Sequence, residues 1–283
     1  MLPKENQESE THNSIIQKSD LPLEINQKYL YLDQSADLYY QSPSYEFLDS
    51  EFIKFVRRFI IEYKIKKLIS LGCGNSFEEL NILSKIKKTI EYTGIDFSQR
   101  MLELSKIILT ENNFFNFKLI QSDFFEPKIY LKSKEKRMFY VSGYTMCNLN
   151  KDEWLNLLNN LKTKDYFIFY VLSIDDPFIY QDVIGDSIDN FCDNPIKINQ
   201  YLKGLNAIGI KAEDGNFLQS ISTDELSVVI NYSFVLKNNK SVKVQDIRIY
   251  SIPKIIDFFD KSKFNLIHKK SILDTCLYIF QKE

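Results

Sequence analysis

The stretch KKLISLGCGNSFEEL, residues 66–80, is the feature that most constrains the fold of this chain. Ile69 and Leu71 end a short apolar run, and Gly72 and Gly74 interrupt it before a polar, helix-like segment begins. This order predicts a strand, a tight glycine turn and a helix. Glycine has no Cβ, so the backbone at such a turn can adopt positive φ and lie directly against a ligand.

Between residues 50 and 175, apolar runs alternate with amphipathic stretches. Within the run DYFIFYVLS, residues 165–173, the centre is continuously apolar, which is typical of a strand buried on both faces. Ser98 and Asn150 stand where helix N-caps are expected. We expect helices at 52–63, 79–88, 98–113 and 151–164, and strands at 66–71, 91–96, 115–123, 137–143 and 165–173. The alternation predicts an α/β fold with a mostly parallel sheet and helices on both faces.

The alternation of apolar runs and amphipathic stretches ends after Pro177. Residues 178–223 read as helical and irregular, and 226–251 as a β-hairpin with its turn at 237–240. A helix is expected at 253–264, with Pro253 near its first position. The segments 264–270 and 275–283 read as closing strands, which would give the sheet an antiparallel edge.

The composition excludes several classes of protein. The net charge is −2, from 36 basic and 38 acidic residues without a basic block, so we expect no nucleic-acid partner. Four cysteines lie far apart and only two histidines occur, so we expect no metal site and reduced, mostly buried thiols. No 18-residue apolar run and no signal-peptide pattern are present, which predicts a cytoplasmic protein without membrane contact.

Polar groups that suit an adenosine follow the next two strands. Asp96 ends the second predicted strand, and Asp123 with Phe124 follows the third. In open α/β sheets ligands lie at the carboxyl ends of the strands, so these residues are expected to meet the glycine turn. The acidic group at the second strand end, with the carboxylate and aromatic ring at the third, indicates S-adenosylmethionine rather than a dinucleotide.

Each residue has an expected role and an alternative. Residues 72–74, which are Gly72, Cys73 and Gly74, would approach the methionine part of the cofactor. Asp96 would accept hydrogen bonds from both ribose hydroxyls, because a carboxylate offers only acceptors. Asp123 would accept the adenine amino group, with Phe124 against the ring. The alternatives are a surface or capping role for Asp96, a turn role for Asp123, and core packing for one of the two phenylalanines at 124–125.

A dinucleotide site is the rival interpretation. Its fingerprint G-x-G-x-x-G requires a third glycine, and Phe77 occupies that position here. The acidic residues Glu78 and Glu79 would repel a pyrophosphate, whereas S-adenosylmethionine carries no phosphate. The sequence of the loop therefore favours S-adenosylmethionine over a dinucleotide as the ligand.

The run FYVSGYTMCNLNKDEWLNLLNNLKTKDYFIFYVLSIDDP, residues 139–177, resembles the histidine-specific methyltransferases of the ergothioneine pathway. Their segment G-S-T-I-G-N-F is matched by Gly143, Thr145 and Asn148. Their cofactor loop L-G-S-G-S-S is similar to LGCGNS at 71–76, and their Y-D-D-A-A-G element to YQDVIGDSIDNF at 180–191. Further similarity lies at 29–47, so the resemblance covers roughly residues 28–282.

The resemblance implies a Rossmann-like class I methyltransferase that methylates an amino acid. Asn148 and Tyr180 would hold the amino and carboxylate groups of the substrate, with Tyr45, Thr145 and Gly143 lining the site, and Gly143 would also contact the cofactor. The alternatives are N-capping of the helix at 151–163 for Asn148 and plain packing for Tyr180.

This sequence departs from the family at three places. Ser70 replaces an acidic residue two positions before the first glycine, and Phe77 with Glu78 replaces a basic residue in the next helix. Gln245 and Ile247 stand where the family holds the substrate imidazole with Glu and Ser. The imidazole-binding pair is therefore not preserved, which leaves open whether the substrate is histidine or an amino acid with a more apolar side chain, which the pair suits.

These observations predict an S-adenosylmethionine-dependent N-methyltransferase for the α-amino group of an amino acid or related small amine. Asp182 or solvent would take the amine proton. The alternatives are a methyltransferase of another small metabolite, with an oxygen or nitrogen acceptor, and a non-catalytic binding module. The expected parts are a mobile tail at 1–20, an N-terminal substrate-binding part at 21–60, the cofactor-binding core at 61–177, a substrate-binding insertion at 178–250 and the closing helix and strands at 251–283.

Overall fold

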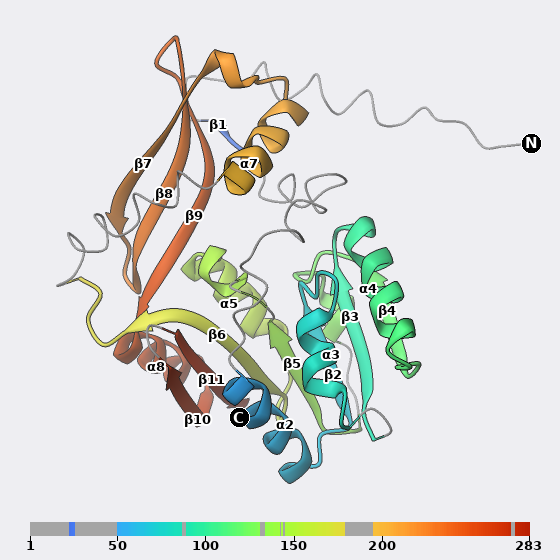
Figure 1. The fold of residues 1–283 in the computed structure, drawn as a ribbon. Coiled ribbons are helices and arrows are strands. Elements are labelled where there is room, and N and C mark those ends of the chain that lie inside the picture. The colour runs from blue at the N-terminus through green and yellow to red at the C-terminus, as the bar shows by residue number, and fades with distance from the viewer. Residues whose placement is uncertain are drawn as a thin grey trace, which may run out of the picture.

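A computed structural model describes most of the chain (Figure 1). The described residues are 23–25, 50–86, 89–130, 134–141, 143, 145–178, 195–272 and 275–283.

Five parallel strands form the centre of the sheet, in the spatial order β4–β3–β2–β5–β6. Their bounds are β2 Lys67–Leu71, β3 Glu91–Asp96, β4 Phe117–Gln121, β5 Arg137–Val141 and β6 Tyr166–Ile174. Leu71 at the end of β2 aligns with Ile95 of β3 and with Val141 of β5. The three strands therefore end at one edge, and the loops that follow them meet there.

Two further strands close the core sheet beside β6. Strand β11 (Thr275–Lys282) pairs antiparallel with β6, and β10 (Phe264–Ile272) pairs antiparallel with β11. The mostly parallel sheet with an antiparallel edge, predicted from the sequence, is thus confirmed. In the described part of the chain, no helix is long and apolar enough to cross a membrane.

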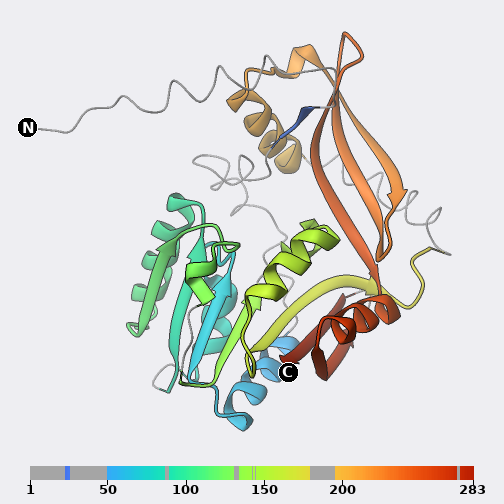
Figure 2. The ribbon, with the colours of Figure 1, turned by 180° about the vertical axis from the view of Figure 1, so that it is seen from behind.

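Helices cover both faces of this sheet, and a separate apolar core lies under each (Figures 1 and 2). On one face lie α2 (Ser50–Glu62), α3 (Phe77–Leu83) and α4 (Gln99–Glu111). On the other lie α5 (Lys151–Asn160) and α8 (Ile252–Lys261). Both predicted caps are confirmed, because Ser98 accepts the Met101 N–H and Asn150 forms a capping box with Glu153.

Three antiparallel strands continue from the far end of β6 (Figures 1 and 2). They are β7 (Gly215–Thr223), β8 (Ser227–Leu236) and β9 (Ser241–Ser251), and β9 joins the last two residues of β6. Helix α7 (Pro195–Ala207) packs on them around Tyr201 and Leu205, and the short β1 (Leu23–Glu24) pairs with β9. The predicted hairpin is confirmed.

Two predictions about local structure were wrong. Residues 215–223, expected to be helical or irregular, form β7, which pairs antiparallel with β8 along its whole length. The helix expected at 79–88 begins at Phe77 and ends at Leu83, and residues 84–86 form turns. The domain boundaries remain predictions.

Candidate functional site

The glycine turn after β2 has the backbone that the sequence predicts. Gly72 and Gly74 have φ of 71° and 51°, and Ser76 also has a positive φ, of 58°. This conformation costs a non-glycine residue roughly 1 kcal/mol or more. The Ser76 hydroxyl offsets that cost through hydrogen bonds to the Tyr92 hydroxyl (2.7 Å) and the Ser105 hydroxyl (2.6 Å). Ser76 therefore anchors the loop to β3 and α4.

The N–H groups of this loop are used within the chain. Gly72 and Cys73 both donate to the Ile95 carbonyl, at 2.8 and 3.0 Å. Gly74 donates to the Asp96 carboxylate, at 2.9 Å. A phosphate-binding loop needs N–H groups that point at the phosphate. These contacts favour a ligand part without phosphate over a pyrophosphate.

Asp96 lies at the end of β3, beside the glycine turn. One carboxylate oxygen accepts the Gly74 N–H and the other accepts the Ser98 N–H, at 2.8 Å. Its side chain is almost fully buried, and burial raises its pKa to about 6 against the opposing effect of these backbone donors. The Phe97 N–H is a third backbone donor to this carboxylate, and the predicted ribose hydroxyls would use the acceptor capacity that the three donors leave.

Asp123 and Phe124 follow β4, as predicted. Asp123 Oδ1 accepts the Phe125 N–H at 3.0 Å, so the carboxylate takes part in a turn. The turn uses one oxygen, and adenine recognition by Asp123 remains a prediction. The rings of Phe124 and Phe125 lie 4.7 Å apart, and both are half-buried against the core.

Cys73 can meet a ligand only through its backbone. Its side chain is buried, and burial raises the pKa of the thiol well above the usual value. The sulfur lies 2.9 Å from the position that a Cβ on Gly94 would occupy, so it points into the sheet.

The 3-10 helix η4 (Thr145–Asn148) connects the glycine turn to β9. A Cβ added to Gly72 would lie 3.5 Å from Thr145 Oγ1 and 3.8 Å from the Phe124 ring. Both side chains therefore lie at ordinary contact distance from this position, and the positive φ of Gly72 is what favours glycine there. Gly143, just before η4, has a positive φ of 58°.

At its other end, η4 brings Asn148 to Gln245. Gln245 Nε2 donates to Asn148 Oδ1 at 3.0 Å, and the Tyr201 hydroxyl donates to Gln245 Oε1 at 2.6 Å. The alternative role of Asn148 as a helix cap is overturned, because Asn150 caps α5. Arg248 also donates to the Asn148 carbonyl oxygen, at 3.3 Å.

The remaining predicted residues are partly outside the described part of the chain. Ile247 is half-buried between two apolar cores, two positions after Gln245 on β9. Tyr45, Tyr180 and Asp182 lie outside the described residues, as do the resembling segments around them. Among the described residues, no group of three His, Cys, Asp or Glu side chains could hold a metal ion.

Glu78 and Glu79, in the first turn of α3, are turned toward the sheet. Glu78 accepts hydrogen bonds from the hydroxyls of Tyr140 and Tyr170 and from the Gly143 N–H. Glu79 is fully buried and accepts a hydrogen bond from the Ser70 hydroxyl. Burial and the neighbouring Glu79 charge raise the pKa of Glu78 to about 8, although the Tyr170 and Gly143 donors oppose this.

This raised pKa predicts a pH dependence of stability for Glu78→Gln. The unfolded carboxyl ionises near pH 4.5 and the folded one near pH 8, so its contribution to stability is lost as the pH rises between them. We expect the variant to gain on the wild type by at most about 1.4 kcal/mol per pH unit in this window. Urea unfolding at pH 5, 6.5 and 8 measures this, and a difference that does not grow with pH contradicts it.

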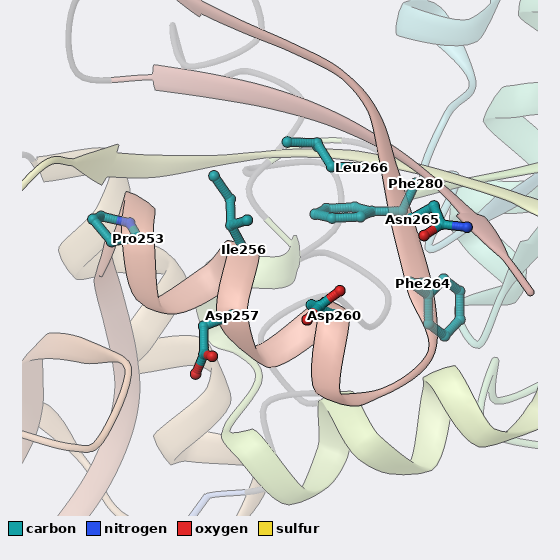
Figure 3. A pocket seen from close by; sticks show the side chains of 8 residues that line it. All are labelled: Pro253, Ile256, Asp257, Asp260, Phe264, Asn265, Leu266 and Phe280. Carbon is teal, nitrogen blue, oxygen red and sulfur yellow. The ribbon is translucent and has the colours of Figure 1, made fainter.

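Two cavities lie away from this edge of the sheet. One of about 380 Å³ lies between α8 and β10, with Ile256, Leu266 and Phe280 in its wall (Figure 3). The other, of about 440 Å³, lies between α8 and Lys151 of α5. No predicted site residue lines either cavity.

Sequence reasoning missed part of this site. Tyr201 carries no local motif, and only the fold places α7 beside β9. Tyr140 and Tyr170 stand in apolar strand segments that indicate core packing alone. Glu78 is visible in the sequence as a departure from the family pattern, but its hydrogen-bond partners are 62 and 92 residues away.

Comparison with solved structures supports the fold. An S-adenosylmethionine-dependent methyltransferase from Clostridium acetobutylicum ATCC 824 matches with a TM-score of 0.51 at 14% identity, over 88% of this chain and 98% of that one. An O-methyltransferase family protein from Burkholderia thailandensis matches with a TM-score of 0.57 at 10% identity, over 94% of this chain and 65% of that one. At such identities the likeness concerns the fold alone.

Sequence comparison gives the family. No curated protein matches the sequence. The family model described as a methyltransferase domain matches residues 64–220, which include the glycine turn, Asp96, η4 and β6. Because this match spans more than half of the sequence, the chain belongs to the methyltransferase domain family.

Proposed function

We propose that this protein transfers the methyl group of S-adenosylmethionine to the α-amino nitrogen of an amino acid or a related small amine. One observation carries the proposal: the short helix η4 joins the glycine turn, through Thr145, to the Asn148–Gln245 pair. A four-residue 3-10 helix rises only about 6 Å over three steps. A cofactor on the turn and a small acceptor at Asn148 would therefore be neighbours.

The residues at the turn fit this cofactor. Gly72 has a positive φ and lies next to Thr145 and Phe124, and Asp96 places a carboxylate beside the turn that ribose hydroxyls could donate to. When bound, S-adenosylmethionine supplies a methyl group on a positively charged sulfur, which an amine can attack in line. Alignment of the two reactants is the main contribution of the protein to such a displacement.

The hydrogen-bond chain fixes the orientation of Asn148. Because Tyr201 donates to Gln245 and Gln245 donates to Asn148 Oδ1, the group that Asn148 can offer to a ligand is its Nδ2 donor. A donor suits a substrate carboxylate rather than an ammonium. The amine must lose its proton before it attacks, because most of an α-amine is protonated at neutral pH.

The side chain of the acceptor is expected to be apolar. Gln245 is engaged by Tyr201 and Asn148, and Ile247 is aliphatic, so neither forms the Glu and Ser pair that the ergothioneine-type enzymes use for imidazole. We therefore infer an amino acid other than histidine, and the resemblance to that family concerns the amino-acid end of the substrate.

The acceptor can be identified with purified protein and methyl-labelled S-adenosylmethionine. Aliphatic and aromatic amino acids, histidine, and the matching amines without a carboxylate would be compared, with mass spectrometry to locate the new methyl group. We expect N-methylation of an apolar amino acid and weaker transfer to its decarboxylated amine. Transfer to histidine alone, or to oxygen acceptors alone, would contradict the proposal.

Asn148→Ala is expected to raise KM for the acceptor about tenfold to 100-fold, with little change in cofactor affinity. A hydrogen bond to a charged group contributes roughly 1.5–3 kcal/mol, and Ala removes the donor. Steady-state kinetics with the best acceptor, together with calorimetry of the cofactor, measures both quantities.

Asn159→Ala is the matched control, because Asn159 is exposed on α5. An Asn148→Ala enzyme with unchanged KM, or with the same effect as the control, would remove Asn148 from the acceptor site.

A further inference from the structure

Glu78 lies at the ligand edge of the sheet although it belongs to a helix. Its carboxylate accepts the N–H of Gly143, which follows β5, at 3.3 Å, and the hydroxyl of Tyr170 on β6 at 2.6 Å. The Tyr140 hydroxyl of β5 is the third donor. The residue as a whole is half-buried.

The donors around Glu78 are all neutral. They are two hydroxyls and one backbone amide, and among the described residues no Lys, Arg or His forms an ion pair with it. Its charged neighbour is another acid, Glu79. Three donors leave about one of the four acceptor positions of a carboxylate unused. The geometry provides a place for a cation that can donate a hydrogen bond.

Asn75, in the glycine turn itself, supplies an independent observation. Its side chain is 1% exposed, and its Nδ2 has no hydrogen-bond acceptor among the residues that the structure describes. Its Oδ1 accepts the Phe77 N–H at 3.2 Å, so the amide orientation is set. A buried donor without an acceptor costs roughly 1–3 kcal/mol. Such a donor indicates an acceptor that comes from outside the chain, and a ligand carboxylate would supply one.

We propose that Glu78 binds the α-ammonium group of the amino-acid part of S-adenosylmethionine. The cofactor carries an ammonium and a carboxylate on one carbon, and Glu78 and Asn75 offer the complementary acceptor and donor three residues apart. Its other cation, the sulfonium, has no hydrogen to donate. This role of Glu78 rests on the proposed cofactor, S-adenosylmethionine, and is independent of the proposed methyl acceptor.

The arrangement explains Ser70. Ser70 leaves no acidic side chain near the carboxyl end of β2, and both glutamates reach this region from the first turn of α3 instead. Because the pKa of Glu78 is raised to about 8, the carboxyl is mostly protonated at pH 7 in the free protein. Pairing with an ammonium favours the ionised form, so binding of the cofactor releases a proton.

Calorimetry with two probes tests the assignment. One probe is S-adenosylhomocysteine, which carries the α-ammonium group. The other is its deaminated analogue, which is identical except that the α-ammonium group is absent. We expect the wild type to prefer S-adenosylhomocysteine at least tenfold, and Glu78→Gln to reduce this preference to about twofold or less. Glu62→Gln, at an exposed position at the end of α2, is the matched control and keeps the preference.

Proton release provides a readout that needs no variant. At pH 7, titrations of the wild type in buffers of different ionisation enthalpy should show proton release with S-adenosylhomocysteine and little with the deaminated analogue. Glu78→Gln should lose this difference. Equal affinity of the wild type for the two probes, or a Glu78→Gln protein that keeps the full preference, would overturn the assignment. An enzyme that binds both probes as expected but methylates no amine would refute the proposed acceptor and leave the role of Glu78 intact.

Discussion

Replacing Asp96 by alanine is expected to lower the affinity for S-adenosylmethionine at least about 100-fold. Asp96 is held at the end of β3 by the N–H groups of Gly74 and Ser98. In the complex, the two ribose hydroxyls would donate to the same carboxylate. Hydrogen bonds to a charged acceptor contribute roughly 1.5–3 kcal/mol each, and about 1.4 kcal/mol corresponds to a factor of ten in affinity.

The pH dependence of binding gives a second check on Asp96. The pKa of Asp96 in the free protein is about 6, and the ribose hydroxyls would bind its ionised form. Affinity should therefore fall as the pH drops below about 6, by up to tenfold per unit, and Asp96→Ala should lack this part of the dependence.

Calorimetry between pH 5 and 8 measures both effects, with Asp260→Ala on the exposed surface of α8 as the control. If Asp96→Ala binds the cofactor as the wild type does, the ribose is not held at the end of β3.

The parts of this site that could be predicted from the sequence are those with local causes. The turn at Gly72 and Gly74 could be predicted from the local sequence, because glycine tolerates positive φ without a steric penalty. Asp96 follows from the same logic, since a carboxylate that ends a strand of a parallel sheet must lie at its carboxyl edge. The N-caps at Ser98 and Asn150 are equally local, and both are present.

The parts that could not be predicted depend on distant pairings. Strand β7 is half-exposed and carries little apolar periodicity, so only its register with β8 reveals it. The link from Asn148 to Gln245 and Tyr201 joins residues 97 and 44 positions apart. In the sequence, Glu78 is one of two acidic residues at the start of a helix. Only the fold shows that Tyr140, Tyr170 and Gly143 donate hydrogen bonds to it.

The buried charged groups at the two edges of the core sheet differ in whether they have an oppositely charged partner. At the carboxyl edge, Asp96 and Glu78 are carboxyl groups whose pKa values burial raises, so their ionised forms cost stability. At the amino edge, Arg137 at the start of β5 forms a buried two-point ion pair with Asp165, which precedes β6. The ion pair at the amino edge thus stabilises the fold. The carboxyl groups at the other edge have no oppositely charged partner among the described residues, so they suit a ligand.

Arg137→Met is therefore expected to destabilise the protein by about 3–5 kcal/mol without changing cofactor affinity. Arg137 Nε and Nη2 lie 2.6 and 2.9 Å from the two oxygens of Asp165, and both side chains are about 95% buried. Removing the cation leaves an ionised carboxylate in the interior, which typically costs this much. Urea unfolding and calorimetry with S-adenosylhomocysteine on the folded protein measure the two quantities.

The double variant Arg137→Met with Asp165→Asn separates pairing from packing. Asp165 Oδ2 also accepts the Lys162 N–H at 2.7 Å, and asparagine keeps an acceptor there without the charge. The double variant should therefore recover much of the stability that Arg137→Met loses. The exposed pair Lys261–Asp257 on α8 is the control, because solvent screens it and Lys261→Ala should change stability little. If Asp165→Asn does not restore the stability that Arg137→Met loses, the arginine acts through packing rather than through its charge. The packing partner would be Phe139, because Arg137 Cζ lies 5.0 Å from the centroid of its ring.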